Sequence, residues 1–465
     1  MGPDFKRPEA PTAPKYLPQS VRLESQTLKP GRDLPSDWWR LFDSPGLNAL
    51  LERALANNPD LAAAKATLAQ ARELAIAQES ALLPALDGQG YVRRQQVSGA
   101  QFGSPSRGST LFSVYNVAIN ASYTIDVFGG IRRQIEAKAA EAEAQRYEME
   151  AARLTLISNV TTTAIQEALL REKLAVTEAV MASQQQQLEI LEKQFRLGGV
   201  PLSAVLAQQS LLTQTQAGVP DLQQQFEQTR HRLTVLSGQA PGAGLAEVFR
   251  LDDFKLPREL PISLPTRLVE QRPDVRAQEA LAHAASAQIG VATTKMFPDV
   301  TLTANLGTVA TRAGDLFMPG SAIWNTGLNL AQPIFHGGQA IHGLRAATAA
   351  FDAAAAQYRS TVLQAFQNVA DVLEALETDE TALKLQRTAE STAAASLALA
   401  QTQYQSGAIS YLALLDSQRT HQQSRLGLVQ AEASRLADTA TLFHALGGGW
   451  WNRKESIAEG KPQEH

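Results

Sequence analysis

The stretch from Phe112 to Val127 alternates between apolar and polar side chains. One side of the pattern is apolar, with Tyr115 near one end and Tyr123 near the other, and the opposite side carries mainly Asn, Ser and Thr. This period of two predicts a β-strand with two unlike faces. At about 3.4 Å per residue, the span between the two tyrosines is roughly 27 Å of strand, which approximates a lipid-facing band edged by aromatic rings.

Similar alternation recurs at residues 301–306 and 324–330, and the second of these segments begins at Trp324. With a less regular strand near 86–95, the sequence predicts two β-hairpins, at about 86–127 and about 299–333. The polar faces carry small neutral side chains, which suit an aqueous lumen. A soluble sandwich with its apolar faces packed together would alternate in the same way and remains an alternative, although two hairpins are few for that fold.

Each predicted β-hairpin is followed by a long segment almost without helix breakers. Residues 131–196 contain neither Pro nor Gly, and residues 339–406 contain Gly343 alone. Each segment predicts one helix of roughly 100 Å, at about 1.5 Å per residue. The alanines between Ala137 and Ala144 would let neighbouring helices approach closely. Return helices are expected at about 201–237 and about 410–446, the first of them interrupted at Gly218–Pro220.

Short motifs occur twice, in the same order and at nearly constant separation, which predicts an internal repeat. The segment Asn57–Leu61 returns as Gln271–Val275, and the Gly-rich segment at 198–199 returns at Gly407. We therefore divide the chain into an extended N-terminal arm (1–37), repeat 1 (38–238, with a long helix at about 131–196), a linker (239–265), repeat 2 (266–450, with a long helix at about 339–405) and a polar tail (451–465).

Composition excludes several classes of function. The formal net charge of -4 is spread evenly and does not favour nucleic acid as a partner. There are no cysteines, and the seven histidines show no metal-ligand spacing. We therefore expect no catalytic residues, no cofactor and no metal site, and no enzymatic activity. No apolar run approaches the roughly 20 residues of a transmembrane helix.

Four strands cannot close a barrel, and open strand edges are not tolerated in lipid. If the strands enter a membrane, several copies of the chain must supply more of them. Three copies would give a barrel of about twelve strands, and two copies a tightly filled barrel of about eight.

Five motifs together resemble the OprM/NodT branch of the TolC outer-membrane factor family: Gly2–Phe5, Trp38–Phe42, Asp126–Gly129, Gln271–Asp274 and Leu446–Trp450. The resemblance covers nearly the whole chain. It implies a mainly α-helical homotrimer with a small β part, in which long antiparallel helical hairpins form a periplasmic tunnel. Four strands per chain would contribute to a twelve-stranded transmembrane β-barrel.

The resemblance also implies a function and partners. The chain would be the exit duct of a tripartite efflux system, such as those of multidrug resistance, in the outer membrane of a Gram-negative bacterium. It would receive substrate from a periplasmic adaptor (a membrane fusion protein) and an inner-membrane pump, of the resistance-nodulation-division type. Members of this branch are usually lipoproteins, acylated (with palmitate, for example) at a Cys before the Gly-Pro-Asp motif. Met1 stands there instead, as expected of a truncated form without the anchor.

Two residues of the second return helix are candidates for a periplasmic gate. Leu412 and Asp416 are four positions apart and so share one helix face. Threefold symmetry would turn them into rings on the tunnel axis, and the resemblance places the closed entrance at these positions. A solvated surface acid is the other interpretation of Asp416. Ile409 stands where some members have a latch arginine, so we expect the closed state to depend on other contacts.

The turns between the long helices are the candidate sites for docking of the adaptor: Gly198, Gly199, Val200, Gly407 and Ala408. Glycine at a turn is equally explained by backbone geometry, so the docking role depends on the resemblance. Tyr115, Tyr123 and Trp324 are the candidate lipid-facing girdle. The main functional alternative is a periplasmic coiled-coil structural or adaptor protein that does not span the membrane.

Overall fold

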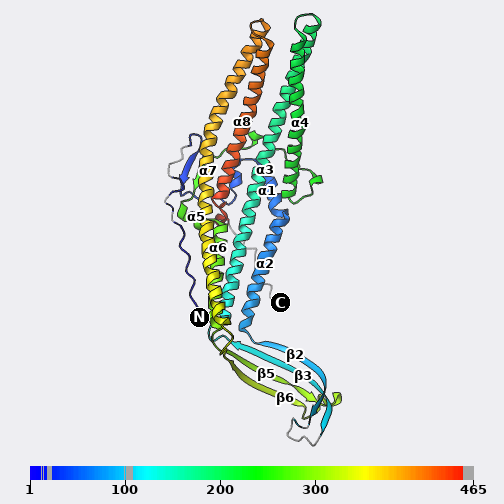
Figure 1. Cartoon of the computed structure of the whole chain (residues 1–465), viewed down its shortest axis with the longest axis vertical. Helices are drawn as coiled ribbons and strands as arrows, with labels where there is room; N and C mark the ends of the chain where they lie inside the picture. Colours follow the sequence, from blue (N-terminus) through cyan, green and yellow to red (C-terminus); the bar gives the residue numbers. More distant parts are fainter. Residues whose placement is uncertain (12, 14, 18–22, 99, 101–107, 454–465) are drawn as a thin grey trace. The chain divides into compact units, whose positions relative to one another are not determined.

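The structure is a computed structural model that describes residues 1–11, 13, 15–17, 23–98, 100 and 108–453 (Figure 1). The chain divides into two compact units. The sheet unit comprises Met1–Glu9, Thr67–Gln145 and Ala277–Tyr358, and the helical unit comprises Ala10–Ala66, Arg146–Arg276 and Arg359–His465. Most of the predicted polar tail and parts of the predicted N-terminal arm lie outside the described residues. Because each unit takes segments from both halves of the chain, the units do not coincide with the two repeats.

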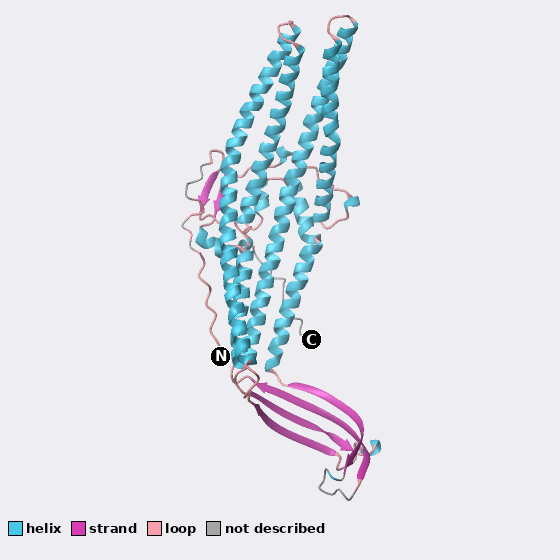
Figure 2. Cartoon of the chain, in the orientation of Figure 1, coloured by secondary structure: helices cyan, strands magenta, loops and turns pink. Residues whose placement is uncertain are grey.

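The same six elements occur twice along the chain (Figure 2). The first set is α1 (Pro45–Asn57), α2 (Pro59–Glu79), β2 (Ala85–Ser98), β3 (Ser109–Ile125), α3 (Gly130–Arg196) and α4 (Leu202–Leu236). The second set is α5 (Pro265–Gln271), α6 (Pro273–Thr294), β5 (Asp299–Ala310), β6 (Ala322–Ala331), α7 (Gln339–Gln405) and α8 (Tyr411–Ala445). Helices α3 and α7 have 67 residues each, and α4 and α8 have 35 each. The predicted fold class, mainly helical with a small β part and an internal repeat, is confirmed.

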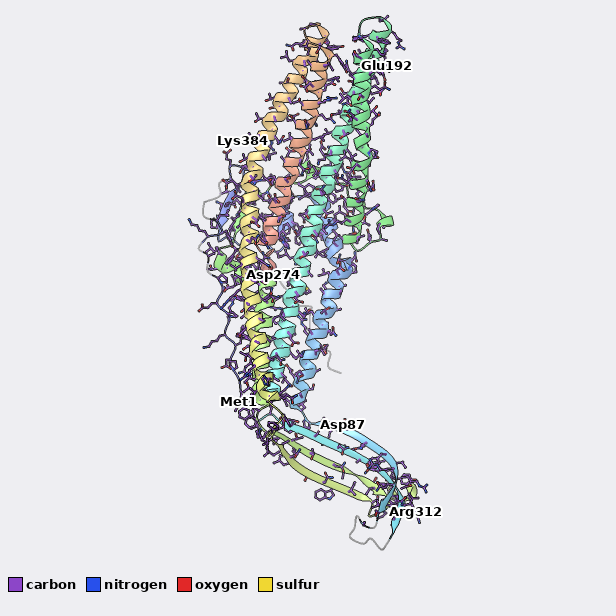
Figure 3. All side chains as sticks on the ribbon, in the orientation of Figure 1. Met1, Asp87, Glu192, Asp274, Arg312 and Lys384 are labelled. Carbon is purple, nitrogen blue, oxygen red and sulfur yellow. The ribbon has the colours of Figure 1, made fainter. Side chains whose placement is uncertain are left out.

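Four strands of the sheet unit form one antiparallel sheet in the order β2-β3-β5-β6. The central pairing, β3 with β5, joins the two repeats, and Ile119 faces Leu306 across it. Strands β2 and β6 lie at the two edges of the sheet. Figure 3 labels Asp87 and Arg312 at opposite ends of this sheet.

The two faces of the sheet differ in chemistry. One face exposes large apolar side chains, including Ile119, Leu306 and Trp324, which lie in one row across three strands. The other face carries a row of short polar side chains: Asp87, Asn120, Asn305 and Asn325. The Asn120 amide donates to Gln89 Oε1 at 3.0 Å, and the Asn305 amide donates to Asn120 Oδ1 at 2.5 Å. The alternation in the sequence therefore separates apolar from polar side chains as predicted.

Alanine lines the helix contacts within the sheet unit. Ala137, Ala140 and Ala144 of α3 are buried at helical spacing, whereas Ala139 is exposed. Helix α6 buries alanines in a similar pattern, at Ala280, Ala284 and Ala287. Small side chains allow helix backbones to approach closely, so these faces suit tight packing. Only the alanines on one face of the predicted run serve this purpose.

The first residues of the N-terminal arm lie against the sheet unit. The amino group of Met1 donates to the Phe128 carbonyl at 2.8 Å, and Arg133 pairs with Asp4 at 2.9 Å. The Phe5 ring stacks on His283 with 4.5 Å between centroids. This end of the predicted extended arm is therefore attached by specific contacts.

Helix α4 differs from the sequence prediction at Pro220. We expected an interruption at Gly218–Pro220, but the helix continues through it. Proline removes one intrahelical hydrogen bond, here to the carbonyl of Gln216. Gln216 and Pro220 are both exposed, so water can satisfy that carbonyl while the turns on either side maintain the helix. The prediction was wrong because a proline breaks a helix only when the local cost outweighs the contacts on both sides.

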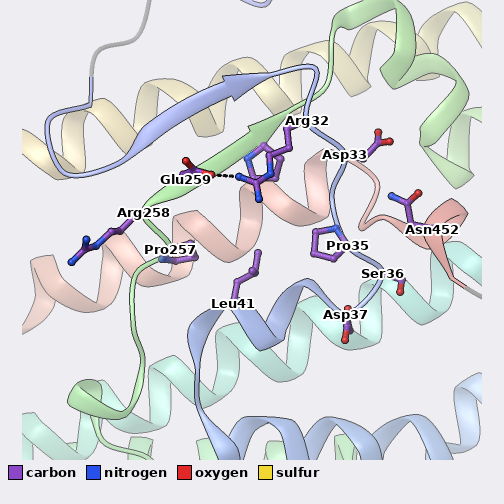
Figure 4. A pocket seen from close by; sticks show the side chains of 11 residues that line it. Arg32, Asp33, Pro35, Ser36, Asp37, Leu41, Pro257, Arg258, Glu259 and Asn452 are labelled. Atoms are coloured by element: carbon purple, nitrogen blue, oxygen red, sulfur yellow. Dashed lines mark hydrogen bonds and ion pairs between the residues drawn. The ribbon is translucent and has the colours of Figure 1, made fainter.

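A short parallel ribbon in the helical unit pairs β1 (Thr27–Pro30), from the predicted arm, with β4 (Glu259–Ile262), from the predicted linker. Beside it lies a cavity of about 620 Å³, where Arg32 pairs with Glu259 (Figure 4). The remaining short elements are 3-10 helices: Trp38–Phe42, Ser80–Leu82, Pro241–Ala243, Leu251–Asp253, Ala313–Asp315 and Trp450–Asn452. Among the described residues, none of the helices has a stretch apolar and long enough to cross a membrane.

Candidate functional site

The two turns between the long helices have the same backbone geometry. Gly198 and Gly407 both have positive φ, at 75° and 73°. Gly199 N–H donates to Gln194 O and Ala408 N–H donates to Gln403 O, both at 2.8 Å. This is the pattern of a helix closed by a glycine in the left-handed region. We call α3–α4 the first hairpin and α7–α8 the second hairpin; Figure 3 labels Glu192 near the first of the two turns.

The turns themselves are exposed, and only their flanks pack. Gly198, Gly199, Gly407 and Ala408 are exposed, whereas Val200 is partly buried. Leu197, beside the first turn, is 86% exposed. The predicted docking residues are therefore available to a partner in the isolated chain, and Val200 also supports the cluster described next.

Just inside the turns, the two hairpins share one apolar cluster. Its fully packed members are Leu188, Leu191, Val205, Leu211, Leu212, Ala400, Tyr411, Leu414 and Leu415. Ile409, at the position of the absent arginine, is a partly buried side chain packed against the same cluster. We expected contacts other than an arginine latch near this position, and the contacts present there are apolar packing.

A buried polar contact links the two hairpins within this cluster. The Tyr411 hydroxyl donates to Gln208 Oε1, and Gln208 Nε2 donates to the Gln184 carbonyl at 2.7 Å. Gln208 is fully buried and Tyr411 is 8% exposed. Burial raises the pKa of Tyr411, so its hydroxyl stays protonated and able to donate. The contact therefore ties α8 to α4 and, through Gln208, to α3.

Sequence reasoning missed this tie. Gln208 stands among many exposed glutamines, and Tyr411 at the start of a helix has no pattern that marks it as buried. Only the packing of one hairpin on the other brings the two side chains together. A glutamine in a run of otherwise apolar buried positions on α4 (Val205, Leu211, Leu212) was the one available signal.

The two predicted gate residues lie on the opposite side of α8 from the cluster. Leu412 is 69% exposed and Asp416 is also exposed, whereas their neighbours Leu414 and Leu415 are buried. An exposed leucine and a carboxylate therefore share one face one helical turn apart, as their spacing predicts. The helix is anchored by its buried face, so the backbone at these two residues is held in place.

The three predicted girdle residues lie on the apolar face of the sheet. Tyr115 and Tyr123 of β3 are half-buried and Trp324 of β6 is 75% exposed. Trp324 lies in the row of Ile119, midway between the rows of the two tyrosines. Because the strands of a barrel are tilted, residues of one row lie at different heights along the membrane normal. The rows of a single chain therefore do not place the three aromatic side chains at one height.

Comparisons with known proteins agree with this architecture. Residues 50–239 and 264–448 match the family model "Outer membrane efflux protein". The pyoverdine export outer membrane protein OpmQ of Pseudomonas aeruginosa is 30% identical over 96% of this chain and 95% of its own. The cation efflux system protein CusC of Escherichia coli is 27% identical over 97% and 95%. The solved outer-membrane channel OprN superimposes with a TM-score of 0.88 at 27% identity, over 97% of this chain and 99% of its own.

These relatives are named as efflux proteins and channels, and none of them supports the alternative of a coiled-coil protein that stays outside the membrane. The two matched segments cover most of the chain and contain both sets of repeated elements. The chain therefore belongs to the outer membrane efflux protein family, and it is an outer-membrane channel of a tripartite efflux system in a Gram-negative bacterium, with a part that extends into the periplasm.

Proposed function

We propose that three copies of this chain form the channel, with their strands closed into one twelve-stranded barrel. The sheet itself is the observation that carries this proposal. Its apolar face is exposed, its polar face carries amides and hydroxyls, and its edge strands β2 and β6 each leave one side without a neighbouring strand among the described residues. Pairing β6 of one copy with β2 of the next would satisfy both edges, as a lipid environment requires. Tyr115, Tyr123 and Trp324 would then face lipid.

Within this channel, Leu412 and Asp416 are the proposed gate. Both are exposed on one face of α8, while the other face is held by the apolar cluster and the Gln208–Tyr411 tie. Three copies would bring three Asp416 carboxylates near one axis, where they would repel each other and attract cations. The three Leu412 side chains would narrow the same passage one turn closer to the helix turn.

The turns of the two hairpins are the proposed contact with a periplasmic adaptor and, through it, with an inner-membrane pump of the resistance-nodulation-division type. Gly198, Gly199, Val200, Gly407 and Ala408 form these turns, and exposed Leu197 adds apolar surface. An exposed leucine at a turn is a suitable anchor for a partner. The proposal assigns the chain no catalytic residue and no cofactor, since a passage needs neither.

Conductance of the full chain in planar lipid bilayers tests the gate. We expect Asp416→Asn to raise the single-channel conductance and to weaken block by added divalent cations, because the carboxylate ring loses its charge. Asp221→Asn, on an exposed part of α4, removes the same charge elsewhere and should change neither quantity. Equal behaviour of the two variants would remove Asp416 from the gate. A protein that inserts no pores in lipid would overturn the channel arrangement itself.

A further inference from the structure

A run of three glycines holds the residues after α8 against α3. Gly447, Gly448 and Gly449 have φ of 90°, 68° and 70°, a backbone conformation that residues with a Cβ rarely adopt. A Cβ on Gly448 would clash with the Leu154 side chain of α3. The glycines therefore allow the 3-10 helix Trp450–Asn452 to lie directly beside α3.

A cavity of about 300 Å³ lies between this 3-10 helix and α3. The residues that line it are Arg146, Glu150, Trp450, Trp451 and Arg453. The Arg453 guanidinium donates to both carboxylate oxygens of Glu150, at 3.0 and 2.5 Å, and Glu150 is only 4% exposed. All five residues belong to the helical unit, so the cavity is formed within one compact part of the chain.

Positive charge exceeds negative charge around the cavity. Arg146, Glu150 and Arg153 are spaced by four and three positions along α3 and so share one helix face. Glu150 is already paired with Arg453, and neither Arg146 nor Arg153 makes an ion pair within the described part of the chain. Burial lowers the pKa of Arg153, and the charge of Arg453 lowers it further, while Glu150 opposes both. Three arginines therefore lie near one carboxylate, which leaves a surplus of positive charge.

Two tryptophans supply the rest of the lining. The Trp450 indole donates to the Gln271 carbonyl at 2.7 Å and packs edge to face on Tyr147, so its ring is held in place. The Trp451 ring lies at 87° to that of Trp450, and its indole N–H makes no hydrogen bond among the described residues. The Arg146 guanidinium lies over the Tyr147 ring, 4.8 Å from its centroid. The cavity therefore combines aromatic surface, an indole donor and an arginine without an acidic partner.

We infer that this cavity binds a small organic anion that carries a carboxylate on a flat apolar body. The Arg146 guanidinium takes the carboxylate, because its planar fork matches the two carboxylate oxygens. The indole rings of Trp450 and Trp451 pack on the apolar body, and the Trp451 N–H donates to the carboxylate. The volume is at the lower end of the range for small-molecule sites. The site lies within one chain and does not depend on the proposed arrangement of three copies.

Isothermal titration calorimetry of the full chain in detergent tests the site, with 2-naphthoate as the probe and detergent without protein as the blank. Two reference compounds separate the two parts of the ligand. The alcohol 2-naphthalenemethanol has the rings without the charge, and acetate has the charge without the rings. At low ionic strength, where charges are little screened, we expect saturable binding of one 2-naphthoate per chain. Each reference compound should bind at least about tenfold more weakly, because it loses either the charged hydrogen bonds or the ring contacts.

Substitution of Arg146 identifies the residue that takes the carboxylate. Arg146→Gln should weaken 2-naphthoate binding by about tenfold or more, since the charged hydrogen bonds are lost. Arg146→Lys keeps the charge without the planar fork and should give an intermediate affinity. Arg359→Gln is the matched control, because Arg359 is exposed on α7 and makes no ion pair within the described part of the chain. Its affinity should equal that of the unchanged chain, and circular dichroism checks that every variant keeps its helical content.

Three outcomes would contradict the inference. Absence of saturable 2-naphthoate binding to the unchanged chain would overturn the site. Equal binding by folded Arg146→Gln and Arg359→Gln would overturn the assignment to this cavity. Equal affinities for 2-naphthoate and acetate would overturn the requirement for an apolar body. The proposed channel is tested separately, by conductance in planar bilayers, so failure of the site and failure of the channel are distinguishable.

Discussion

The first and second hairpins have the same lengths and turns, yet they stabilise their interiors with opposite charges. In the first hairpin, the fully buried Glu167 accepts from Arg171 at 2.5 Å and from Arg230 at 3.0 Å. At nearly equivalent positions of the second, Arg435 is 1% exposed, donates to the Leu376 carbonyl and is surrounded by Asp379, Glu380 and Asp438. The repeat therefore conserves backbone geometry, whereas the side chains of each hairpin are specialised separately.

The faces of the hairpins are specialised in the same way. Tyr411 and Leu415 of the second hairpin are buried, while Leu202 and Leu206, at the same positions counted from the first residue of the return helix, are exposed. Gate candidates occur on one hairpin only, because Ser203 and Ala207 stand where the second hairpin has Leu412 and Asp416. Equal backbones with unequal faces mean that the two hairpins should respond differently to equivalent substitutions.

The largest expected difference is between Leu415→Ala and Leu206→Ala. Removing the buried Leu415 side chain should lower the free energy of unfolding by about 2–5 kcal/mol, as expected for a leucine in a packed core. Leu206→Ala should change the free energy of unfolding by less than about 0.5 kcal/mol, because Leu206 is 54% exposed. Denaturant unfolding followed by circular dichroism measures both variants. If both variants lowered the free energy of unfolding by the same amount, the proposed difference between the two leucines would be wrong.

Loss of the polar tie should have a smaller effect. Tyr411→Phe leaves the buried Gln208 Oε1 without its donor, which should cost about 1–3 kcal/mol. Tyr404→Phe is the control, because the neighbouring Tyr404 ring packs at 5.4 Å and its hydroxyl makes no hydrogen bond within the described part of the chain. We expect Tyr411→Phe, but not Tyr404→Phe, to increase channel opening in bilayers. If Tyr411→Phe neither destabilises the protein nor opens the channel, the tie has no such role.

The last expected effect concerns pH. Burial raises the pKa of Asp379 from 3.8 to about 7, aided by a hydrogen bond and repulsion from Asp438 and opposed by Arg435. A raised folded-state pKa means that the folded protein keeps a proton that the unfolded chain releases. The contribution of this group to stability therefore falls as pH rises from about 4 to about 7. Asp379→Asn should flatten that slope, as measured by thermal unfolding across this range, and an unchanged slope would exclude Asp379 as its source.

Several features of the fold were predictable because they depend on local chemistry. Long segments almost without Pro or Gly mark the two long helices, and alternation of apolar and polar residues marks the strands. The spacing of Leu412 and Asp416 is enough to place them on one face of a helix, whatever that helix packs against. Pro220 shows the limit of this reasoning, because a local cost was overcome by contacts along a 35-residue helix.

The sequence by itself determined the repeat, the lengths of the long helices and the separation of polar from apolar faces on the strands. Each of these follows from periodicity or from the absence of helix breakers over long stretches. Only the tertiary structure decided that β3 pairs with β5 across the repeats, that the arm and the linker form a ribbon, and that Gln208 meets Tyr411. Such contacts join residues far apart in the chain, and a pattern along one segment carries no information about which distant segment will cover it.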